Sequence, residues 1–428
     1  MSKKLWSLIQ QETKRQQETL DLIPSENVAD PELLKVLGTP LVNKYSEGYP
    51  ERRYYGGNAV IDKIELLAQA EGLKAFKLVG GLSTELSPAA LKDEAFASRT
   101  RWYLNVQAYS GSPANLAIYF ALVKPGDTVM GLKLTQGGHL THGFGLNFSG
   151  TFYNAVQYNL KPETGAIDYD EMERLAVEHK PKMIYSGATA YPRTIDFKRI
   201  GAIAKKVGAY HVADVSHIAG LIAAGAHPSP FPHADVVMAT THKTMRGPRG
   251  AVIYARTPAI AAAINKAIIP GVQGGPHNNQ TAAIALMFEN MQKPAFKKYG
   301  TQIVKNAKTL ATALTGYGFN LVSGGTDNHL LLIDLKNKQV SGADAERLLD
   351  AAGIISNRNT VPGDEKPLNP SGIRMGTPAV TSRGMKEKEM QRIAGYIHRL
   401  IDEKEAPAKI RKEVAALCKR FPLAYTTR

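Results

Sequence analysis

Val236-Val237-Met238-Ala239-Thr240-Thr241-His242-Lys243-Thr244-Met245-Arg246-Gly247-Pro248-Arg249-Gly250 is the stretch of sequence on which the interpretation of the whole chain depends. Its apolar start is typical of a buried strand, which stops at Lys243 and a Gly-Pro turn. An amine held there against apolar surroundings has a lowered pKa and can form a Schiff base with an aldehyde. A solvated lysine in a turn would give the same pattern, so this stretch alone leaves both readings open.

Strand-like and helical patterns alternate on both sides of this stretch, which predicts an α/β fold with a mostly parallel sheet covered by helices on both faces. The predicted strands are 128–134, 152–158, 183–186, 210–215, 236–240 and 251–254, and the clearest helices between them are 169–179 and 197–207. Ligands of such sheets bind at the carboxyl ends of the strands. The candidates there are His139, Asp214 with His217, and Lys243.

A smaller α/β region is predicted after the bridging helices 279–291 and 294–317. Its elements are a strand at 330–334, a helix at 341–352, a strand at 372–375, and helices at 386–403 and 407–421. Residues 5–20 predict an N-terminal helix with one apolar face. The expected organisation is a helical arm over 1–40, a large domain over 41–292 and a small domain over 293–428.

Three further features each allow a structural and a functional interpretation. Ser110-Gly111-Ser112 precedes a helix that runs to Val123, so it is either an ordinary helix cap or a phosphate cup of free N–H groups and hydroxyls. Asp214 is either a semi-buried carboxylate with a cationic partner or the cap of a neighbouring helix. Arg374 in an apolar strand faces either a bound carboxylate or a structural aspartate.

Two segments lack the spacing of apolar residues that is typical of a helix or a strand. Residues 43–57 are rich in tyrosine, arginine and glycine and are expected to form a binding loop. Residues 78–101 are expected to form an extended surface loop with one short helix near 89–96.

The composition is that of a globular protein of two domains. The chain has 428 residues, of which 43% are hydrophobic and 21% charged, and it has no signal-peptide-like start and no apolar run of membrane-spanning length, so we expect a cytoplasmic protein. Its single cysteine, Cys418, excludes a disulfide framework and a cysteine-rich metal site, and no metal is expected. The net charge of +15 is scattered over helices, which favours a solvated face over a nucleic-acid or membrane surface.

Together these features match the needs of pyridoxal phosphate. The cofactor requires an amine, a carboxylate for its ring nitrogen, a group against the ring face, a phosphate cup, and an arginine for the carboxylate of an amino acid. Lys243 follows Asp214 by 29 positions, which leaves room for one helix and a strand, so both can come from strand ends of one sheet.

The chain also resembles the serine hydroxymethyltransferase family, which has the aspartate-aminotransferase-like fold, from about Leu5 to Arg420. The resemblance implies fold type I of the pyridoxal phosphate enzymes, with a seven-stranded sheet in the large domain. The motifs that carry it, in chain order, are Ile23 to Asn27, Asn43 to Gly57, Ser110 to Ser112, Gly137 to Gly143, Asp214 to His217, Thr240 to Gly250, Gly274 to Pro276, and Ser371 to Pro378.

The resemblance implies roles around the cofactor. Lys243 matches the Schiff-base lysine, Asp214 the partner of the pyridine nitrogen, and His139 the ring stacked on the cofactor. His217 and Thr189 match groups near the phenolic oxygen and the substrate. The residues implied for the phosphate are Ser110, Gly111 and Ser112, with Tyr45, Gly274 and Gly275 contributed by a second subunit.

It also implies roles around the substrates. Arg374 and Ser25 match the binders of the amino-acid carboxylate. Glu47, Tyr54 and Tyr55 match groups that reach across a dimer to the serine hydroxymethyl group and the folate, and Glu47 is the expected acid/base group. The residues implied for the pterin pocket are Leu134, Leu140 and Asn359.

The implied reaction is the reversible conversion of L-serine and tetrahydrofolate into glycine and 5,10-methylenetetrahydrofolate, in one-carbon metabolism and glycine biosynthesis. A homodimer with shared active sites is implied, and a tetramer is left open. Two alternatives stay open: a folate-independent aldolase or transaldolase of β-hydroxy amino acids, and a basic RNA-binding protein that has kept the fold. His242 and Arg249 are expected to fix Lys243 and the loop that carries it.

Overall fold

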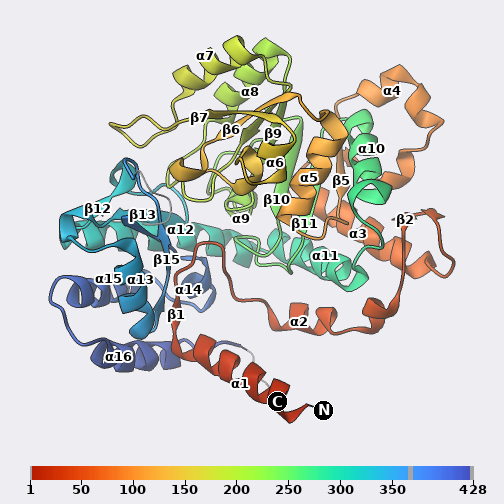
Figure 1. Cartoon of the computed structure of the whole chain (residues 1–428). Helices are drawn as coiled ribbons and strands as arrows, with labels where there is room; N and C mark the ends of the chain where they lie inside the picture. Colours follow the sequence, from red (N-terminus) through yellow and green to blue (C-terminus); the bar gives the residue numbers. More distant parts are fainter. Residues whose placement is uncertain (1, 365–369, 425–428) are drawn as a thin grey trace.

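The computed structural model describes residues 2–364 and 370–424, and its largest feature is a twisted sheet of eight strands with helices packed around it (Figure 1). The strand order is β4-β5-β11-β10-β9-β8-β6-β7. The strands are β4 (Gly80–Gly81), β5 (Trp102–Asn105), β6 (Thr128–Leu132), β7 (Asn154–Tyr158), β8 (Met183–Ser186), β9 (Tyr210–Asp214), β10 (Val236–Thr240) and β11 (Ala251–Ala255). All neighbours pair in parallel except β11, which is antiparallel to both β10 and β5.

The α/β class and the mostly parallel sheet are therefore confirmed, and the strand count is corrected from seven to eight. The additional strand, β4, consists of two glycines at the sheet edge. Glycine gives no hydrophobic alternation, so no local pattern indicated a strand there. The six strands predicted between residues 128 and 254 all form.

Side-chain alternation along the strands builds a separate core on each face of this sheet. On β10, Val237 and Ala239 belong to one buried cluster, whereas Val236 and Met238 belong to the other. All five residues of β10 are buried, and burial of each large apolar side chain contributes roughly 1.5–3 kcal/mol. Helices α3 (Ala59–Ala75), α7 (Tyr169–His179), α8 (Phe197–Val207) and α11 (Asn278–Gln292) contribute to the first cluster, and α5 (Gly111–Leu122) and α10 (Pro258–Lys266) to the second.

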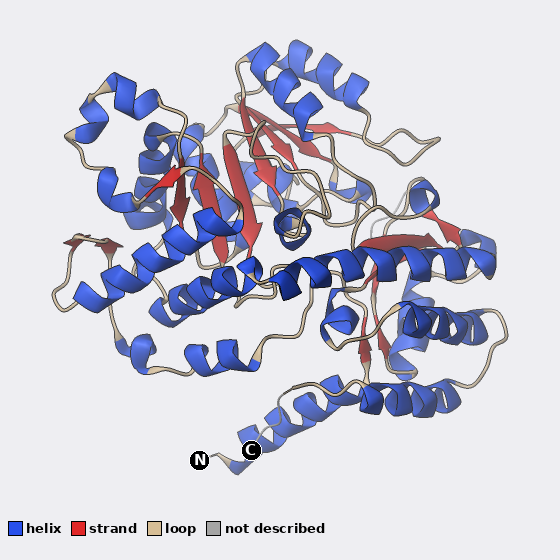
Figure 2. Ribbon diagram, turned by 180° about the vertical axis from the view of Figure 1, so that it is seen from behind, coloured by secondary structure: helices blue, strands red, loops and turns tan. Residues whose placement is uncertain are grey.

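The long helix α12 (Pro294–Gly316) leads from this sheet to a smaller one, as both ribbon views show (Figures 1 and 2). The smaller sheet has the order β12-β13-β16-β15, with all pairs antiparallel. Its elements are β12 (Asn320–Leu321), β13 (Leu330–Asp334), β15 (Asn357–Asn359), β16 (Gly372–Gly376), α13 (Gly342–Ala351), α15 (Glu387–Ile401) and α16 (Pro407–Arg420).

The N-terminal segment packs against this smaller region. Helix α1 (Lys3–Glu18) lies along α16, and β1 (Leu20–Asp21) pairs in parallel with β14 (Ile354–Ile355). Leu20 and Leu22 are part of its hydrophobic cluster. The boundaries 1–40, 41–292 and 293–428 stay a prediction. In the part of the chain that the structure describes, no helix is long and apolar enough to cross a membrane.

Two loop predictions need correction. Residues 43–57 contain a small hairpin of β2 (Gly48–Tyr49) and β3 (Arg52–Arg53). The single helix predicted near 89–96 is two short ones, at 90–92 and 94–98. Asp93 separates them, because its side chain accepts hydrogen bonds from the backbone N–H groups of Ala95 and Phe96 and caps the second helix.

Candidate active site

One cavity at the carboxyl ends of β9 and β10 collects half of the predicted cofactor residues, together with Thr189. Parallel pairing places Met238 beside Asp214, so the residues that follow both strands open at the same sheet edge. The predicted residues that line the cavity are Lys243, Asp214, His139, His217, Thr189 and Gly111. Residues separated by up to 132 positions therefore meet in one place.

Lys243 is buried, with 8% of its surface exposed, so the solvated-lysine alternative is wrong. Burial lowers the pKa of Lys243 to about 8, against the opposing attraction of Asp214 and with help from the charge of Arg374. Asn27 donates to the Lys243 carbonyl oxygen at 2.7 Å and fixes the backbone behind the amine. The amine is therefore neutral in a large fraction of molecules near pH 8, as a nucleophile requires.

The burial of this amine makes a prediction about stability. The unfolded chain, with a lysine pKa near 10.5, binds more protons than the folded chain between pH 8 and 10.5, so the free energy of unfolding rises with pH there. Lys243→Met should stabilise the cofactor-free protein at pH 7 by up to about 3 kcal/mol, and the gain should fade towards pH 10.5. Urea unfolding at both pH values measures this, with the exposed Lys266→Met as the matched control. A gain that is the same at both pH values would contradict it.

Asp214 is a buried carboxylate surrounded by hydrogen-bond donors. Oδ2 accepts from Asn115 Nδ2 at 3.0 Å and lies 3.2 Å from His142 Nε2, and Oδ1 accepts from the Ser216 backbone N–H at 3.1 Å. Burial opposes ionisation, but the hydrogen bond and charge of His142 outweigh it and hold the pKa of Asp214 well below its ordinary value. Asp214 therefore stays ionised, and the N-cap residue of the helix that follows it, Ala219–Ala223, is Ile218.

His139 lies beside this carboxylate as a neutral ring. Its Nδ1 accepts from the Thr141 backbone N–H at 3.2 Å and lies 2.7 Å from the Thr141 hydroxyl. Burial, together with His142, lowers the pKa of His139 to about 4. An uncharged imidazole with a fixed orientation suits stacking on an aromatic ring.

The start of α5 forms an anion cup next to the cavity. Ser110 is the N-cap residue, yet its side chain makes no capping hydrogen bond, so the first N–H groups of the helix stay available. Gly111 lies so close to Thr240 that a Cβ on it would be 2.7 Å from Thr240 Cγ2. The Thr240 hydroxyl is buried and has no partner among the described residues. Uncapped N–H groups, the hydroxyls of Ser110 and Ser112, and this buried hydroxyl fit a phosphate group.

Arg374 on β16 is a cation that pairs with no carboxylate among the described residues. It donates through Nη1 to the Thr189 carbonyl oxygen at 2.6 Å and through Nε to Asn357 Oδ1 at 3.1 Å. Burial lowers the pKa of Arg374 to about 10, so it stays charged at neutral pH. Within residues 2–364 and 370–424 it forms no ion pair, which contradicts the alternative of a structural aspartate. A half-buried guanidinium without an ion pair favours an anionic ligand.

Thr189 and His217 have internal partners that the sequence did not indicate. The Thr189 hydroxyl donates to the Gly138 carbonyl oxygen at 2.9 Å, which ties it to the loop that carries His139. His217 Nδ1 lies 3.1 Å from His329 Nε2, and both rings are buried. Burial lowers the pKa of both rings, so both are neutral and one can donate its N–H to the other across this contact.

A second group of predicted residues lies outside this cavity. Gly274 and Gly275 face Glu47 and Tyr45: a Cβ on Gly274 would lie 3.1 Å from Glu47 Oε1, and one on Gly275 would lie 3.0 Å from the Tyr45 ring. The rings of Tyr45 and Tyr55 pack edge to face, with centroids 5.2 Å apart and planes at 79°. None of these residues lines the Lys243 cavity, and Tyr54 is 72% exposed. The predicted site residues thus fall into two separate groups within the chain.

The remaining predicted residues lie around these groups. Ser25 lines a neighbouring cavity behind the lysine loop, together with His242 and Arg249, whose side chains approach to 3.3 Å. Leu134 starts a short helix (Leu134–Gln136), and Leu140 is 46% exposed. Asn359 ends β15, next to Thr360, whose hydroxyl donates to the Thr135 carbonyl oxygen at 3.0 Å. That contact brings the segments of Asn359 and Leu134 together.

Sequence reasoning missed Asn115, His142, Thr240 and His329 as site residues. His142 lies three residues after His139 in the same glycine-rich run, and Asn115 lies one helical turn after Gly111, so spacing could have indicated both. His329 lies in the smaller region, and no local pattern connects it with His217.

The observed residues fit pyridoxal phosphate: a buried amine, an ionised carboxylate, a neutral ring and an uncapped helix start line one cavity, and Arg374 lies beside it, hydrogen-bonded to the carbonyl oxygen of Thr189. A family model described as serine hydroxymethyltransferase matches residues 1–397. Enzymes of that family are pyridoxal-phosphate-dependent transferases of fold type I that use tetrahydrofolate. Because the match covers almost the whole chain and the fold agrees with it, this protein belongs to the serine hydroxymethyltransferase family.

Proposed function

We propose that this protein converts L-serine and tetrahydrofolate reversibly into glycine and 5,10-methylenetetrahydrofolate, as part of one-carbon metabolism. The observation that carries the proposal is the buried Lys243 amine, with its pKa lowered to about 8, in one cavity with the ionised Asp214. When bound there, pyridoxal phosphate supplies an electron sink that stabilises negative charge on the α-carbon of the amino acid.

Each group of the cavity has one task in this proposal. Lys243 bonds the cofactor aldehyde, Asp214 keeps the ring nitrogen protonated, and His139 packs against the ring face. The start of α5, with Ser110 and Ser112, holds the phosphate. Arg374 binds the amino-acid carboxylate as a forked pair of N–H donors, next to Thr189.

Proton transfer at the serine hydroxyl is assigned to Glu47 of a second subunit. Glu47, Tyr45 and the Gly274-Gly275 turn form a half-site away from Lys243, and a homodimer would bring the half-site of each chain to the cavity of the other. Exposed apolar side chains on α1 and around the loop support such an interface, among them Leu5 (57%), Val42 (67%) and Val60 (65%). Tyr54 and Tyr55, with Leu134, Leu140 and Asn359, would line the folate pocket.

Shared sites can be tested by mixing two inactive variants. Lys243→Ala damages the cavity, and Glu47→Gln damages the half-site, so a mixed dimer contains one site with both defects and one intact site. Unfolding and refolding a 1:1 mixture should restore about a quarter of the wild-type turnover, since about half of the dimers are mixed. Each variant refolded alone is the control. A mixture that stays inactive while mixed dimers form would show that each chain builds its own site.

The reaction itself is tested by glycine formation from serine with and without tetrahydrofolate, beside cleavage of allo-threonine. Strong dependence on tetrahydrofolate is expected. Equal rates without it would favour the alternative, a folate-independent aldolase of β-hydroxy amino acids. Colourless protein that gains no visible absorbance with pyridoxal phosphate would exclude both enzyme functions and favour the RNA-binding alternative.

A further inference from the structure

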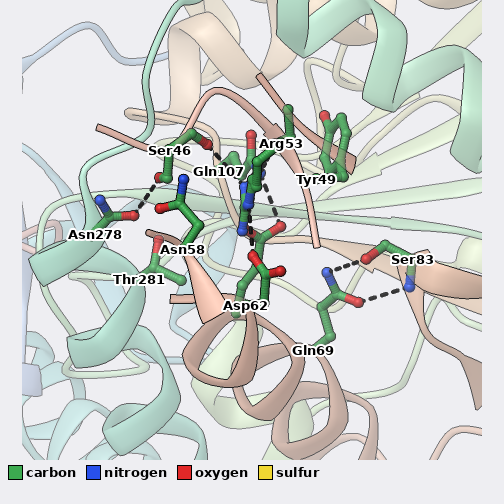
Figure 3. Close-up of polar contacts among 12 residues, drawn as sticks. Ser46, Tyr49, Arg53, Asn58, Asp62, Gln69, Ser83, Gln107, Asn278 and Thr281 are labelled. Atoms are coloured by element: carbon green, nitrogen blue, oxygen red, sulfur yellow. Dashed lines mark hydrogen bonds and ion pairs between the residues drawn. The ribbon is translucent and has the colours of Figure 1, made fainter. Parts of the chain in front are cut away.

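A buried guanidinium lies under the loop that carries Glu47. The Arg53 side chain is 4% exposed, and its Nη1 donates to the carbonyl oxygens of Ser46 at 2.9 Å and Gly48 at 2.7 Å. These are the two residues on either side of Glu47. In Figure 3 the side chain of Arg53 lies at the centre of the polar contacts, with Ser46 on one side and Asp62 on the other.

Two carboxylates of α3 hold the guanidinium in place. Nε donates to Asp62 Oδ1 at 2.8 Å, and Nη2 donates to Glu65 Oε2 at 2.7 Å. The Glu65 side chain is 3% exposed; burial raises its pKa, and the charge of Arg53 opposes that rise. Only a planar fork of donors can reach two carboxylates and two carbonyls at once, so lysine cannot replace arginine here.

Gln107 extends this network to the other parts of the site. Its Nε2 donates to the Gly48 carbonyl oxygen at 3.0 Å and to Glu65 Oε1 at 2.9 Å. The backbone carbonyl oxygen of Gln107 accepts from Gln273 Nε2 at 2.8 Å. The side-chain oxygen of Gln273, Oε1, accepts from the Tyr109 backbone N–H at 3.0 Å. The hairpin is thereby joined to the segment before α5 and to the turn that carries the glycine pair.

The loop is also held from its other side. The buried Ser46 hydroxyl donates to Asn278 Oδ1 at 2.6 Å (Figure 3). Asn278 Nδ2 donates in turn to the Lys44 carbonyl oxygen at 2.7 Å. The Tyr54 backbone N–H donates to the Glu47 carbonyl oxygen at 3.0 Å. The main chain on both sides of Glu47 is therefore fixed by buried groups.

We propose that Arg53, held by Asp62 and Glu65, is a positioning residue that fixes the main chain around Glu47 and so aims its carboxyl group at the substrate. The inference rests on the proposed function, because Glu47 acts there as the acid/base group. Arg53 itself touches neither substrate nor cofactor in this assignment. A reacting group that is misplaced by about 1 Å loses on the order of 100-fold in rate.

The test compares Arg53→Lys with Arg52→Lys, its neighbour in the same hairpin. Arg52 donates to the carbonyl oxygens of Ser83 and Leu86 instead, so its substitution disturbs the hairpin but not the peptide of Glu47. Backbone hydrogen exchange, followed by mass spectrometry on the cofactor-free protein, should accelerate at least about tenfold over residues 46–54 in Arg53→Lys only. Equal acceleration in both variants, or none in either, would overturn the proposal.

A double-mutant cycle separates positioning from general structural damage. Arg53→Lys should lower kcat by about 10- to 100-fold with the serine KM and the bound pyridoxal phosphate nearly unchanged, and it should have no further effect in a Glu47→Gln background. Additive losses would show that Arg53 acts elsewhere and would refute the inference. Full activity of Glu47→Gln alone would remove Glu47 from the proposed reaction, whereas the exchange result would still report on the loop.

Discussion

Lys243→Ala is expected to lose serine-to-glycine turnover by more than about 1,000-fold while the fold and the proposed dimer persist. No other amine lines the cavity in the described part of the chain, so nothing replaces the lysine as the group that bonds the cofactor aldehyde. The substitution removes a charge whose burial is unfavourable, so the protein should not be destabilised through electrostatics. Turnover, circular dichroism and sedimentation of the same preparation measure the three parts of this prediction.

Borohydride trapping adds a chemical readout. Reduction of the wild-type protein in the presence of pyridoxal phosphate should attach the cofactor to the peptide that contains Lys243, and the variant should stay unlabelled. Lys266→Ala, at the exposed end of α10, is the control and should label at Lys243 as the wild type does. Normal serine-to-glycine rates in Lys243→Ala would refute the assignment of the lysine.

Asp214→Asn is the second large effect, with an expected loss of about 100- to 1,000-fold in kcat. The amide keeps the shape of the carboxylate but carries no charge, so it cannot hold a proton on the cofactor ring nitrogen. Its NH₂ group would also face donors, because Asn115 and His142 both point at Oδ2. Steady-state kinetics with serine, together with the amount of bound cofactor, measure whether the loss lies in turnover or in binding.

Asp235→Asn provides a matched control for this prediction. Asp235 precedes β10 at the opposite end of the sheet, and its side chain accepts from the His211 backbone N–H at 2.9 Å. An amide oxygen can still accept that hydrogen bond, so turnover should stay near the wild-type level. If Asp214→Asn were as active as this control, the carboxylate would have no role in the chemistry.

Both predictions depend on residues that the sequence indicated without the structure. A strand of β-branched and apolar residues that stops at a polar side chain identifies a strand end, and parallel strands place such ends at one edge. For that reason Lys243, Asp214 and His139 could be named from local pattern and chain order. Alternation between helix and strand likewise predicted the class of the fold.

Partnerships over long sequence distances needed the structure. Nothing near Asp214 indicates Asn115, which lies 99 positions away, or His142, which lies 72 positions away. The two-glycine strand β4 was also not predicted, because glycine has no side chain and so shows no alternation of apolar and polar residues.

By itself the sequence determined the elements, the order of the strand-end residues and the family motifs, because these depend on side-chain period and chain order. Only the tertiary structure decided that Lys243 is buried rather than solvated, that Arg374 has no aspartate within the described residues, and that Glu47 lies outside the Lys243 cavity. Burial and pairing depend on what the rest of the chain places around a group, and the pKa of a side chain follows those surroundings rather than its neighbours in sequence.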